Sequence, residues 1–421
     1  MSLRLDDQDR ALLAGDGGEA ARMAMRLLLR LATIADAPHF IDITCAHIDS
    51  CLYHGRAGLD FALRLADGGA RVAVRTTLNV SSLDLLHPQH YRGDAETAVQ
   101  ARRLMDAYVG MGCQPTWTCA PYQLAERPGR GEHIAWAESN AIVFANSVLG
   151  ACTDRYGDFT DICAAITGRV PFAGLHRPEN RLGNVVFRMH GVSDRLLDED
   201  ALYPVLGHLV GRLHEGGVPV LDGLPPPMEE DRMKAIGAGA ASAGAVALFH
   251  VVGVTPEAPT LPDALGRRTP VRTIDVSPAL LRSGRDELTT RTAGPLMAVS
   301  LGTPHFSLAE FERLLPLIRD ARFAENVDVW VNTARHILDA VRDNGWLDAF
   351  QNAGVRIVTD TCNYITPILR RTNGVVMTNS AKWAYYAPGN LGVDVAFGTL
   401  EECVYSAMTG RIVRNDEIWR D

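Results

Sequence analysis

Three cysteines that are far apart in the chain stand where ligand-binding residues are expected. Cys51, Cys119 and Cys362 each follow a predicted strand. Thiolates bind zinc and iron–sulfur clusters, but the chain has no CxxC and no HExxH spacing, so spacing alone predicts no particular metal. Cysteine also packs well as a small apolar residue in protein cores. For Cys45 and Cys51 that packing role stays open beside ligation.

A glutamate and a lysine lie in apolar segments, where a charge needs a partner or a task. Glu138 and Ser139 are near the start of residues 133–150, which are predicted to form a buried, mostly apolar helix. A buried carboxylate is costly unless it is paired, so Glu138 has either a function or a structural hydrogen bond. Lys382 lies at a predicted helix start, where backbone amides and a lysine suit a carboxylate or a phosphate.

Neutral hydrogen-bonding groups accompany these charges. Thr76, Thr77 and Asn79 stand at the carboxyl end of a predicted strand and suit a polar substrate, although such residues also cap helices. In open α/β sheets, ligands bind beyond the carboxyl ends of the strands. Thiols, amides, a glutamate and a lysine converging there suit an iron–sulfur Lewis acid that acts on a substrate bearing a carboxylate.

Alternating strands and helices over the first 180 residues must position part of this set. A strand is predicted over 40–44, opening into a polar loop over 45–54, and a second strand begins at 71. Helices are predicted up to about residue 66 and over 95–111. We assign Asp158 and Asp161 to internal ion pairs. Packing roles are assigned to three further cysteines, Cys113, Cys152 and Cys163.

The rest of the chain continues the same alternation of strands and helices. Residues 184–275 form a compact α/β unit with parallel strands. The glycine-rich stretch over 235–246 precedes a strand, so its context rejects a phosphate loop. A strand is predicted to end at Gly302, followed by a helix whose start carries a capping box from Ser307 to Glu310. Cys403 is predicted to belong to a helical core.

Length and composition set the broad class of the protein. The 421 residues are 47% hydrophobic and 22% charged, which is typical of a globular protein of two or three domains. A net charge of -9 without a basic stripe argues against nucleic-acid binding. No leader-like segment or run of about 18 apolar residues occurs, so we expect a soluble protein without a membrane partner. Eight cysteines are too few for a disulfide scaffold, which favours a reducing, cytoplasmic location.

Eight motifs in this order resemble the aconitase X family, a branch of the aconitase superfamily, over almost the whole chain. They are AHIDSCLYHG, RTTLNV, TWTCAPY, AWAESNAIVFANSVLGA, AAITGRVPFAGLH, GTPHFS, DTCNYI and TNSAKWAYYAPG. The resemblance implies an aconitase-like body of stacked α/β units with largely parallel sheets, here over 1–180, 181–290 and 291–421. It also implies a swivelling domain that completes the active site. We expect that domain to be a separate small subunit, because this chain stops at Asp421.

Two activities are implied by the family. One branch dehydrates cis-3-hydroxy-L-proline to pyrroline-2-carboxylate, and the other dehydrates mevalonate 5-phosphate. In the archaeal pattern the cluster cysteines match Cys119, Cys362 and the position after Gly302, which here is Thr303. This departure favours the hydroxyproline branch and leaves Cys51 as the third ligand. A 2Fe-2S cluster is then favoured over a 4Fe-4S cluster.

The resemblance also implies roles for the site residues. Lys382, with Ser50 and Asn79, would hold the substrate carboxylate. Glu138 and Ser139 would contact the ring nitrogen or the hydroxyl. By analogy with aconitase, the general base is expected on a serine of the small subunit.

Three other interpretations compete with this dehydratase. They are a mevalonate 5-phosphate dehydratase, a non-catalytic α/β subunit and a zinc hydrolase. The zinc hydrolase is disfavoured, because the close histidines His87 and His90 straddle Pro88 with no carboxylate between them.

Overall fold

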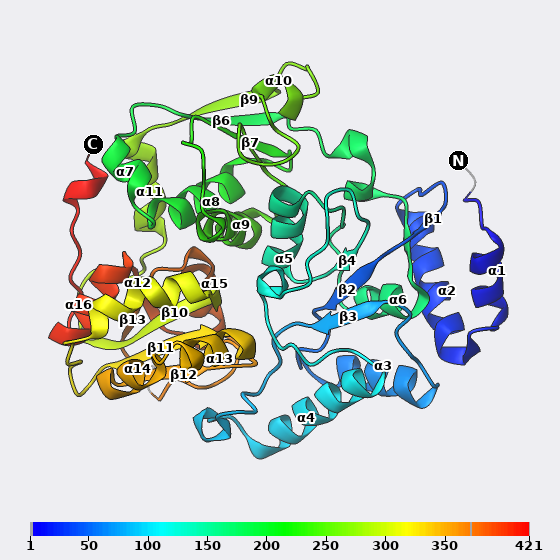
Figure 1. Ribbon diagram of the computed structural model, residues 1–421, viewed down its shortest axis with the longest axis horizontal. Coiled ribbons are helices and arrows are strands. Elements are labelled where there is room, and N and C mark those ends of the chain that lie inside the picture. The colour runs from blue at the N-terminus through cyan, green and yellow to red at the C-terminus, as the bar shows by residue number, and fades with distance from the viewer. Residues whose placement is uncertain (1–2, 371–372, 421) are drawn as a thin grey trace. The chain divides into compact units, whose positions relative to one another are not determined.

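The structure is a computed structural model that describes residues 3–370 and 373–420, and these residues form two compact units (Figure 1). The first unit comprises Met1–Leu83 and Gly93–Leu182, and the second comprises Asp84–Arg92 and Gly183–Asp421. The segment Asp84–Arg92 belongs to the second unit although its neighbours in the sequence belong to the first, and Asp84 makes hydrogen bonds to that second unit. Its carboxylate accepts from the Thr359 backbone N–H at 2.9 Å. The division at 1–180, 181–290 and 291–421 stays a prediction.

The first unit is built on a small parallel sheet in the order β3-β2-β4, with a two-stranded antiparallel sheet of β1 and β5 beside it in the same unit. Helix α6 packs on β2, and α3 packs on α4. Its strands are β1 (Phe40–Asp42), β2 (Cys45–Ile48), β3 (Arg75–Leu78), β4 (Ala135–Trp136) and β5 (Arg169–Pro171). Its helices are α1 (Asp7–Ala14), α2 (Gly18–Ile34), α3 (Arg56–Asp67), α4 (Ala95–Gly110), α5 (Ser139–Phe144) and α6 (Thr160–Thr167).

Two local predictions for this unit were wrong. Cys45 and His47 do not lie in a polar loop but in the buried strand β2, whose residues pair with β3 on one side and β4 on the other. The polar loop therefore begins only at Asp49. Residues 133–150 start with the short strand β4 before α5 begins, and Ala145–Leu149 continue α5 as a π-helix. Tertiary pairing decided both cases, because short apolar runs suit a strand and a buried helix equally well.

The second unit contains two parallel sheets, the first in the order β8-β7-β6-β9. The predicted alternation over 184–275 is confirmed. Its strands are β6 (Val185–Met189), β7 (Pro219–Asp222), β8 (His250–Val251) and β9 (Arg272–Val276). Its helices are α7 (Asp194–Asp198), α8 (Leu202–Leu213), α9 (Glu230–Gly244), α10 (Leu261–Ala264) and α11 (Pro278–Glu287).

The glycine-rich stretch lies inside helix α9 and packs directly on α8 (Figure 1). A Cβ on Gly239 would lie 2.8 Å from the His208 backbone nitrogen, and one on Gly207 would lie 2.3 Å from the Ile236 carbonyl oxygen. These glycines let two helix backbones approach closely. Rejecting a phosphate loop here was correct.

We therefore predict that Gly207→Ala lowers the free energy of unfolding by about 1–3 kcal/mol, because the new methyl group overpacks the helix contact. The urea midpoint of the purified protein measures this. Gly389 in α15 is the matched control, since a Cβ there would meet nothing within 4 Å. Gly389→Ala should stabilise by about 0.5–1 kcal/mol. Equal midpoints for the two variants would contradict the close approach of α8 and α9.

The second sheet of this unit has the order β12-β11-β10-β13-β14, all parallel. The chain adds β11 and β12 on one side of β10 and then returns to its other side, so the order reverses between β10 and β13. Its strands are β10 (Leu296–Phe306), β11 (Asp328–Thr333), β12 (Val355–Val358), β13 (Val375–Thr378) and β14 (Asp394–Phe397). Its helices are α12 (Leu308–Ile318), α13 (Arg335–Asp343), α14 (Leu347–Ala353), α15 (Ala381–Leu391) and α16 (Leu400–Thr409).

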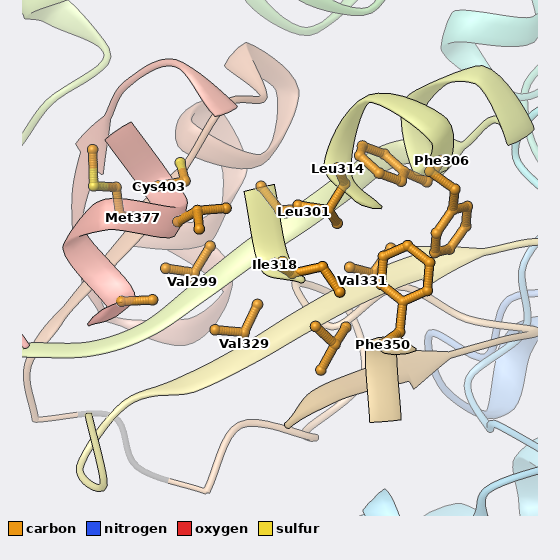
Figure 2. Packing of buried hydrophobic residues seen from close by; sticks show 14 of the residues in the cluster. Val299, Leu301, Phe306, Leu314, Ile318, Val329, Val331, Phe350, Met377 and Cys403 are labelled. Carbon is orange, nitrogen blue, oxygen red and sulfur yellow. The ribbon is translucent and has the colours of Figure 1, made fainter. Parts of the chain in front are cut away.

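The core of this part packs branched residues of β10 and β11 against helices α12, α14 and α16 (Figure 2). Phe311 meets Phe306 and Phe350 edge to face, each at 5.2 Å between ring centroids. Cys403 is fully buried in the same cluster, so its predicted core role is confirmed. The capping box from Ser307 to Glu310 is also present.

Strand β10 runs beyond its predicted end at Gly302 and reaches Phe306. Gly302 has a φ of 80°, and a Cβ there would lie 2.1 Å from the Asn332 carbonyl oxygen. The register with β11 shifts between Leu301 and Phe306. The glycine thus makes a bulge rather than a strand end, and the residues after it, including His305, remain in the sheet.

No helix in the described ranges 3–370 and 373–420 combines the length and the apolar character needed to cross a bilayer.

Candidate functional site

Three polar residues lie at the carboxyl edge of the β3-β2-β4 sheet. Asn79 directly follows β3, Asp49 directly follows β2, and Glu138 lies two residues beyond β4. The strand order reverses at β2, since β3 and β4 flank it. Such reversals are where open α/β sheets bind ligands.

Glu138 caps helix α5 and is buried, with 4% of its surface exposed. One carboxylate oxygen accepts from the Ala141 backbone N–H at 2.8 Å and from the Asn140 amide, and the other accepts from the Ser139 hydroxyl at 3.2 Å. These donors hold the carboxylate in place within a buried setting. The structural hydrogen bonding that the sequence left open is therefore present, and it also fixes where any substrate contact would occur.

Cys119 is anchored to the same group. The Asn140 amide donates to the Cys119 carbonyl oxygen at 2.8 Å, and the Tyr122 hydroxyl donates to the Asn140 side-chain oxygen at 2.6 Å. The preceding residue, Thr118, donates its backbone N–H to Leu78 at the end of β3. Asn140 thus ties the buried Cys119 loop to Glu138, a link that spacing in the sequence did not reveal.

Asp161 holds the turn that follows β2. Its carboxylate accepts from the backbone N–H groups of Asp49 and Ser50 at 2.9 and 3.0 Å, and from the Ser50 hydroxyl at 2.8 Å. The ion pair expected for Asp161 was wrong, because neutral donors satisfy this carboxylate. Ser50 also contacts the Tyr108 hydroxyl at 2.6 Å. Both sides of the Ser50 hydroxyl are therefore occupied by protein groups.

Asp49 is partly exposed and lies beside other carboxylates. Desolvation is the main cause that raises the pKa of Asp49 to about 7, and the negative charges of Glu138, Asp158 and Asp161 raise it further. The Asn79 side-chain amide donates to the Asp49 carboxylate.

Cys51 is fully buried and faces backbone carbonyls rather than an open space. Its sulfur lies 3.3, 3.5 and 3.7 Å from the carbonyl oxygens of Ile48, Asn79 and Val80. Burial raises the pKa of the Cys51 thiol well above its ordinary range. Its role as a metal ligand stays a prediction, and ligation would require the thiol to leave these carbonyls.

In the second unit, the reversal between β10 and β13 opens onto a cavity of about 570 Å³. Its lining includes Thr303 from β10, and Ser380 and Lys382 from the start of α15. The chain has only two lysines, since all other members of its 41 basic residues are arginines. Both lysines, Lys234 and Lys382, are buried and line this cavity.

The two lysines differ in their surroundings. Burial lowers the pKa of Lys234, but the charges of Asp231 and Glu310 outweigh burial and raise it above its ordinary value. Lys234 contacts both carboxylates, the one of Asp231 at 2.8 Å. Beside Lys382, the Ser380 hydroxyl accepts from the Trp383 backbone N–H and donates to the Thr303 carbonyl oxygen. Thr303 is 95% buried, and its hydroxyl has no hydrogen-bond partner among the described residues.

Cys362 follows β12 as predicted, and its loop is locked by Asn363. The Asn363 side-chain oxygen accepts from Trp383 and Ser300, each at 2.9 Å. The ligand atoms of Cys362 and His305 lie within 4.8 Å of each other. The His305 Nε2 atom lies 3.2 Å from the Thr361 carbonyl oxygen. Since a carbonyl only accepts, Nε2 carries the hydrogen and Nδ1 keeps its lone pair.

Sequence reasoning therefore placed Cys362 beyond a strand and Lys382 at a helix start, but the strand predicted before Cys119 is only an isolated bridge at Gln114, and several partners were missed. Asp49, Asn140 and Asp161 organise the first unit's edge, and His305 stands beside Cys362. Sequence reasoning gave His305 and Asp49 no partners, because Cys362 and Asn79, which lie beside them, are distant in the chain.

Comparison with known proteins decides the family. Models of the first, second and third domains of aconitase X match residues 2–179, 183–286 and 296–409. The chain is 46% identical to the cis-3-hydroxy-L-proline dehydratase of Pseudomonas aeruginosa, over 97% of this chain and 70% of that protein.

This chain belongs to the aconitase X family.

Aconitase X proteins of archaea are also similar to it. The chain is 37% identical to the phosphomevalonate dehydratase large subunit of Methanothermobacter thermautotrophicus, over 93% of this chain and 96% of that subunit. A crystal structure of Thermococcus kodakaraensis aconitase X in its holo form superposes with a TM-score of 0.86 and 30% identity, covering 96% of this chain and all of that one. The aconitase-like α/β class with largely parallel sheets is confirmed.

The donors of this aconitase X chain suit the iron–sulfur cluster that its family suggests. Cys119 and Cys362 are buried cysteines, and thiolates are the usual ligands of such clusters. Burial is the main cause that lowers the pKa of His305 to about 4, so its imidazole is neutral and able to ligate. Its hydrogen bond to a backbone carbonyl is the contact that commonly orients a metal-bound histidine.

Proposed function

We propose that this protein is a hydro-lyase that converts cis-3-hydroxy-L-proline to pyrroline-2-carboxylate. The observation that carries the proposal is the 46% identity to a cis-3-hydroxy-L-proline dehydratase over 97% of this chain. The structure supports it with buried cysteines, a glutamate that caps helix α5 and a buried lysine at the start of helix α15.

The chain's own residues would bind and orient the substrate. Lys382 would hold the substrate carboxylate in the cavity that it lines, helped by the N-terminus of α15. When the proton on the carbon next to the carboxylate leaves, negative charge grows on that carboxylate, and the contact with Lys382 becomes stronger in the transition state. Glu138 and Ser139 would contact the ring nitrogen or the hydroxyl. The proton and the hydroxyl leave together as one water, and the resulting enamine tautomerises to the cyclic imine.

We propose Cys119, Cys362 and Cys51 as the thiolates that hold an iron–sulfur cluster, with 2Fe-2S favoured over 4Fe-4S. When bound, such a cluster supplies a Lewis acid that makes a hydroxyl a better leaving group. His305 is an alternative to Cys51 because its ligand nitrogen lies within 4.8 Å of the Cys362 sulfur.

We further propose a small swivelling partner subunit that carries the general base, and a cytoplasmic location. The relative in Methanothermobacter thermautotrophicus is called a large subunit, which supports a small partner. Eight cysteines, too few for a disulfide scaffold in a chain of this length, support a reducing compartment.

The test is to purify the chain anaerobically, with and without the small subunit, and to assay pyrroline-2-carboxylate together with iron and sulfide content. We expect turnover only when both polypeptides and the cluster are present. Full activity of the isolated chain would refute the split site.

The second candidate function is a mevalonate 5-phosphate dehydratase, because the chain is 37% identical to a phosphomevalonate dehydratase large subunit. A panel of both substrates distinguishes it from the hydroxyproline enzyme. Turnover of mevalonate 5-phosphate without turnover of hydroxyproline would overturn the proposed substrate. A protein without iron, and unaffected by loss of Cys119 or Cys362, would instead be the non-catalytic subunit.

A further inference from the structure

The carboxyl edge of the β3-β2-β4 sheet carries two neighbouring carboxylates, those of Asp49 and Asp161. Asp49 and Asp161 have no ion-pair partner among the described residues. Asp161 is buried behind the edge and has its hydrogen bonds satisfied by Ser50, Asp49 and Ile162. Asp49 is the partly exposed carboxylate, so it is the group that a ligand would meet.

Asn79 adds an acceptor without a donor at the same place. Its side-chain nitrogen donates to Asp49, which fixes the orientation of the amide. Its side-chain oxygen then has no partner among the described residues, although Asn79 is 98% buried. A buried carbonyl oxygen without a donor is unfavourable, so a ligand that brings an N–H group would satisfy it.

The same hydrogen bonds argue against a carboxylate at this edge. The Asn79 amide nitrogen is turned toward Asp49, and the Ser50 hydroxyl is occupied by Asp161 and Tyr108. A substrate carboxylate would face the Asp49 carboxylate and an acceptor oxygen. Two neighbouring carboxylates repel each other.

A metal ion is a weaker match than an organic cation. Hard cations such as Mg²⁺ and Ca²⁺ take six or more oxygen ligands. Among the residues that the structure describes, Asp49, Glu138 and Asp161 do not bring three carboxylate oxygens within 4.8 Å of one another. The Asp161 oxygens are also used by backbone and hydroxyl donors.

We infer that this edge binds the ring ammonium group of the substrate, with Asp49 as its counter-ion and the Asn79 side-chain oxygen as its second acceptor. The inference rests on the proposed function and assigns a positioning role that the sequence did not suggest. A secondary ammonium has two N–H donors, which matches one carboxylate and one amide oxygen. This subsite also favours hydroxyproline over a phosphorylated hydroxy acid, because the latter has no N–H group and carries more negative charge.

The experiment compares two ligands of the same ring size, L-proline and tetrahydrofuran-2-carboxylate, in which an ether oxygen replaces the ammonium group. Calorimetry is carried out on the cluster-loaded protein with its small subunit. We expect wild type to bind L-proline at least about tenfold more tightly, and Asp49→Asn to reduce this preference about 10- to 100-fold. The control Asp158→Asn removes an exposed charge nearby and should leave the preference within about twofold.

The outcomes separate the two proposals. If wild type turns over cis-3-hydroxy-L-proline but binds both ligands equally, or if Asp49→Asn keeps the preference, the ammonium subsite is wrong and the function stands. If neither ligand binds and hydroxyproline is not turned over, both proposals fail. If Mg²⁺ raises the melting temperature of wild type but not of Asp49→Asn, and competes with L-proline, the edge is a metal site. Should Asp49→Asn not fold, the wild-type ligand preference and Asn79→Ala still test the subsite.

Discussion

Replacing Cys119 or Cys362 by serine is expected to remove the visible absorbance of the cluster and to lower dehydratase activity by at least about 100-fold. A serine hydroxyl is similar in size to a thiol but is a poor ligand for iron–sulfur clusters, which select thiolates. Cys119 is held by Asn140, and Cys362 precedes the locked Asn363, so neither loop offers a replacement ligand from a flexible neighbour. Iron and sulfide content, absorbance and product formation on anaerobically purified protein measure the effect.

The matched controls are two buried cysteines that the proposal does not use, Cys163 in the first unit and Cys403 in the second. Cys163→Ser and Cys403→Ser place a hydroxyl in an apolar core and should cost about 1–3 kcal/mol of stability while keeping the cluster. Loss of iron in these controls, to the same extent as in the test variants, would contradict a specific ligand role for Cys119 and Cys362.

The same preparation identifies the third ligand. Cys51→Ser should lose the cluster if Cys51 leaves its backbone carbonyls to ligate. His305→Ala should lose it if the imidazole beside Cys362 ligates instead. Retention of iron in one variant and loss in the other assigns the ligand.

Replacing Lys382 by methionine is expected to lower kcat/KM by about 100- to 1000-fold. Removing one partner of a buried, charge-assisted contact costs about 2–5 kcal/mol, and a contact that strengthens as the proton leaves should reduce kcat as well as raise KM. Lys382→Arg keeps the charge and should retain more activity than Lys382→Met. Steady-state kinetics on hydroxyproline provides both parameters.

Arg232 is the matched control, because it lines the same cavity but is paired with Asp200 at 2.8 Å. Arg232→Met should change kcat/KM by less than about threefold, since exposed ion pairs contribute little.

Because the chain has only two lysines, labelled lysine gives two side-chain signals in NMR, apart from any tag. L-proline should shift the Lys382 signal and leave that of Lys234 in place, since Lys234 is already paired. A shift confined to the Lys234 signal would contradict the assignment of Lys382 as the carboxylate-binding residue.

The sequence could determine much of this protein because its information is local. Glycines after helices, Ser307 with Glu310 and alternating branched residues fix where elements begin and end, and the predicted alternation over 184–275 is confirmed. Cys362 lies beyond a strand, and Glu138 and Lys382 lie at helix starts, as the patterns predicted, whereas the strand predicted before Cys119 is only an isolated bridge at Gln114.

Tertiary structure decided what depends on neighbours distant in sequence. Strand β2 forms because β3 and β4 pair with it on both sides, and β10 passes Gly302 because a bulge against β11 needs no side chain there. The charge preference of a site is also tertiary. Asn79 can donate or accept, and its hydrogen bond to Asp49 leaves its buried side-chain oxygen as an acceptor without a partner among the described residues. Residue types therefore identified the chemistry available, while the packed hydrogen-bond network decided which groups remain for a ligand.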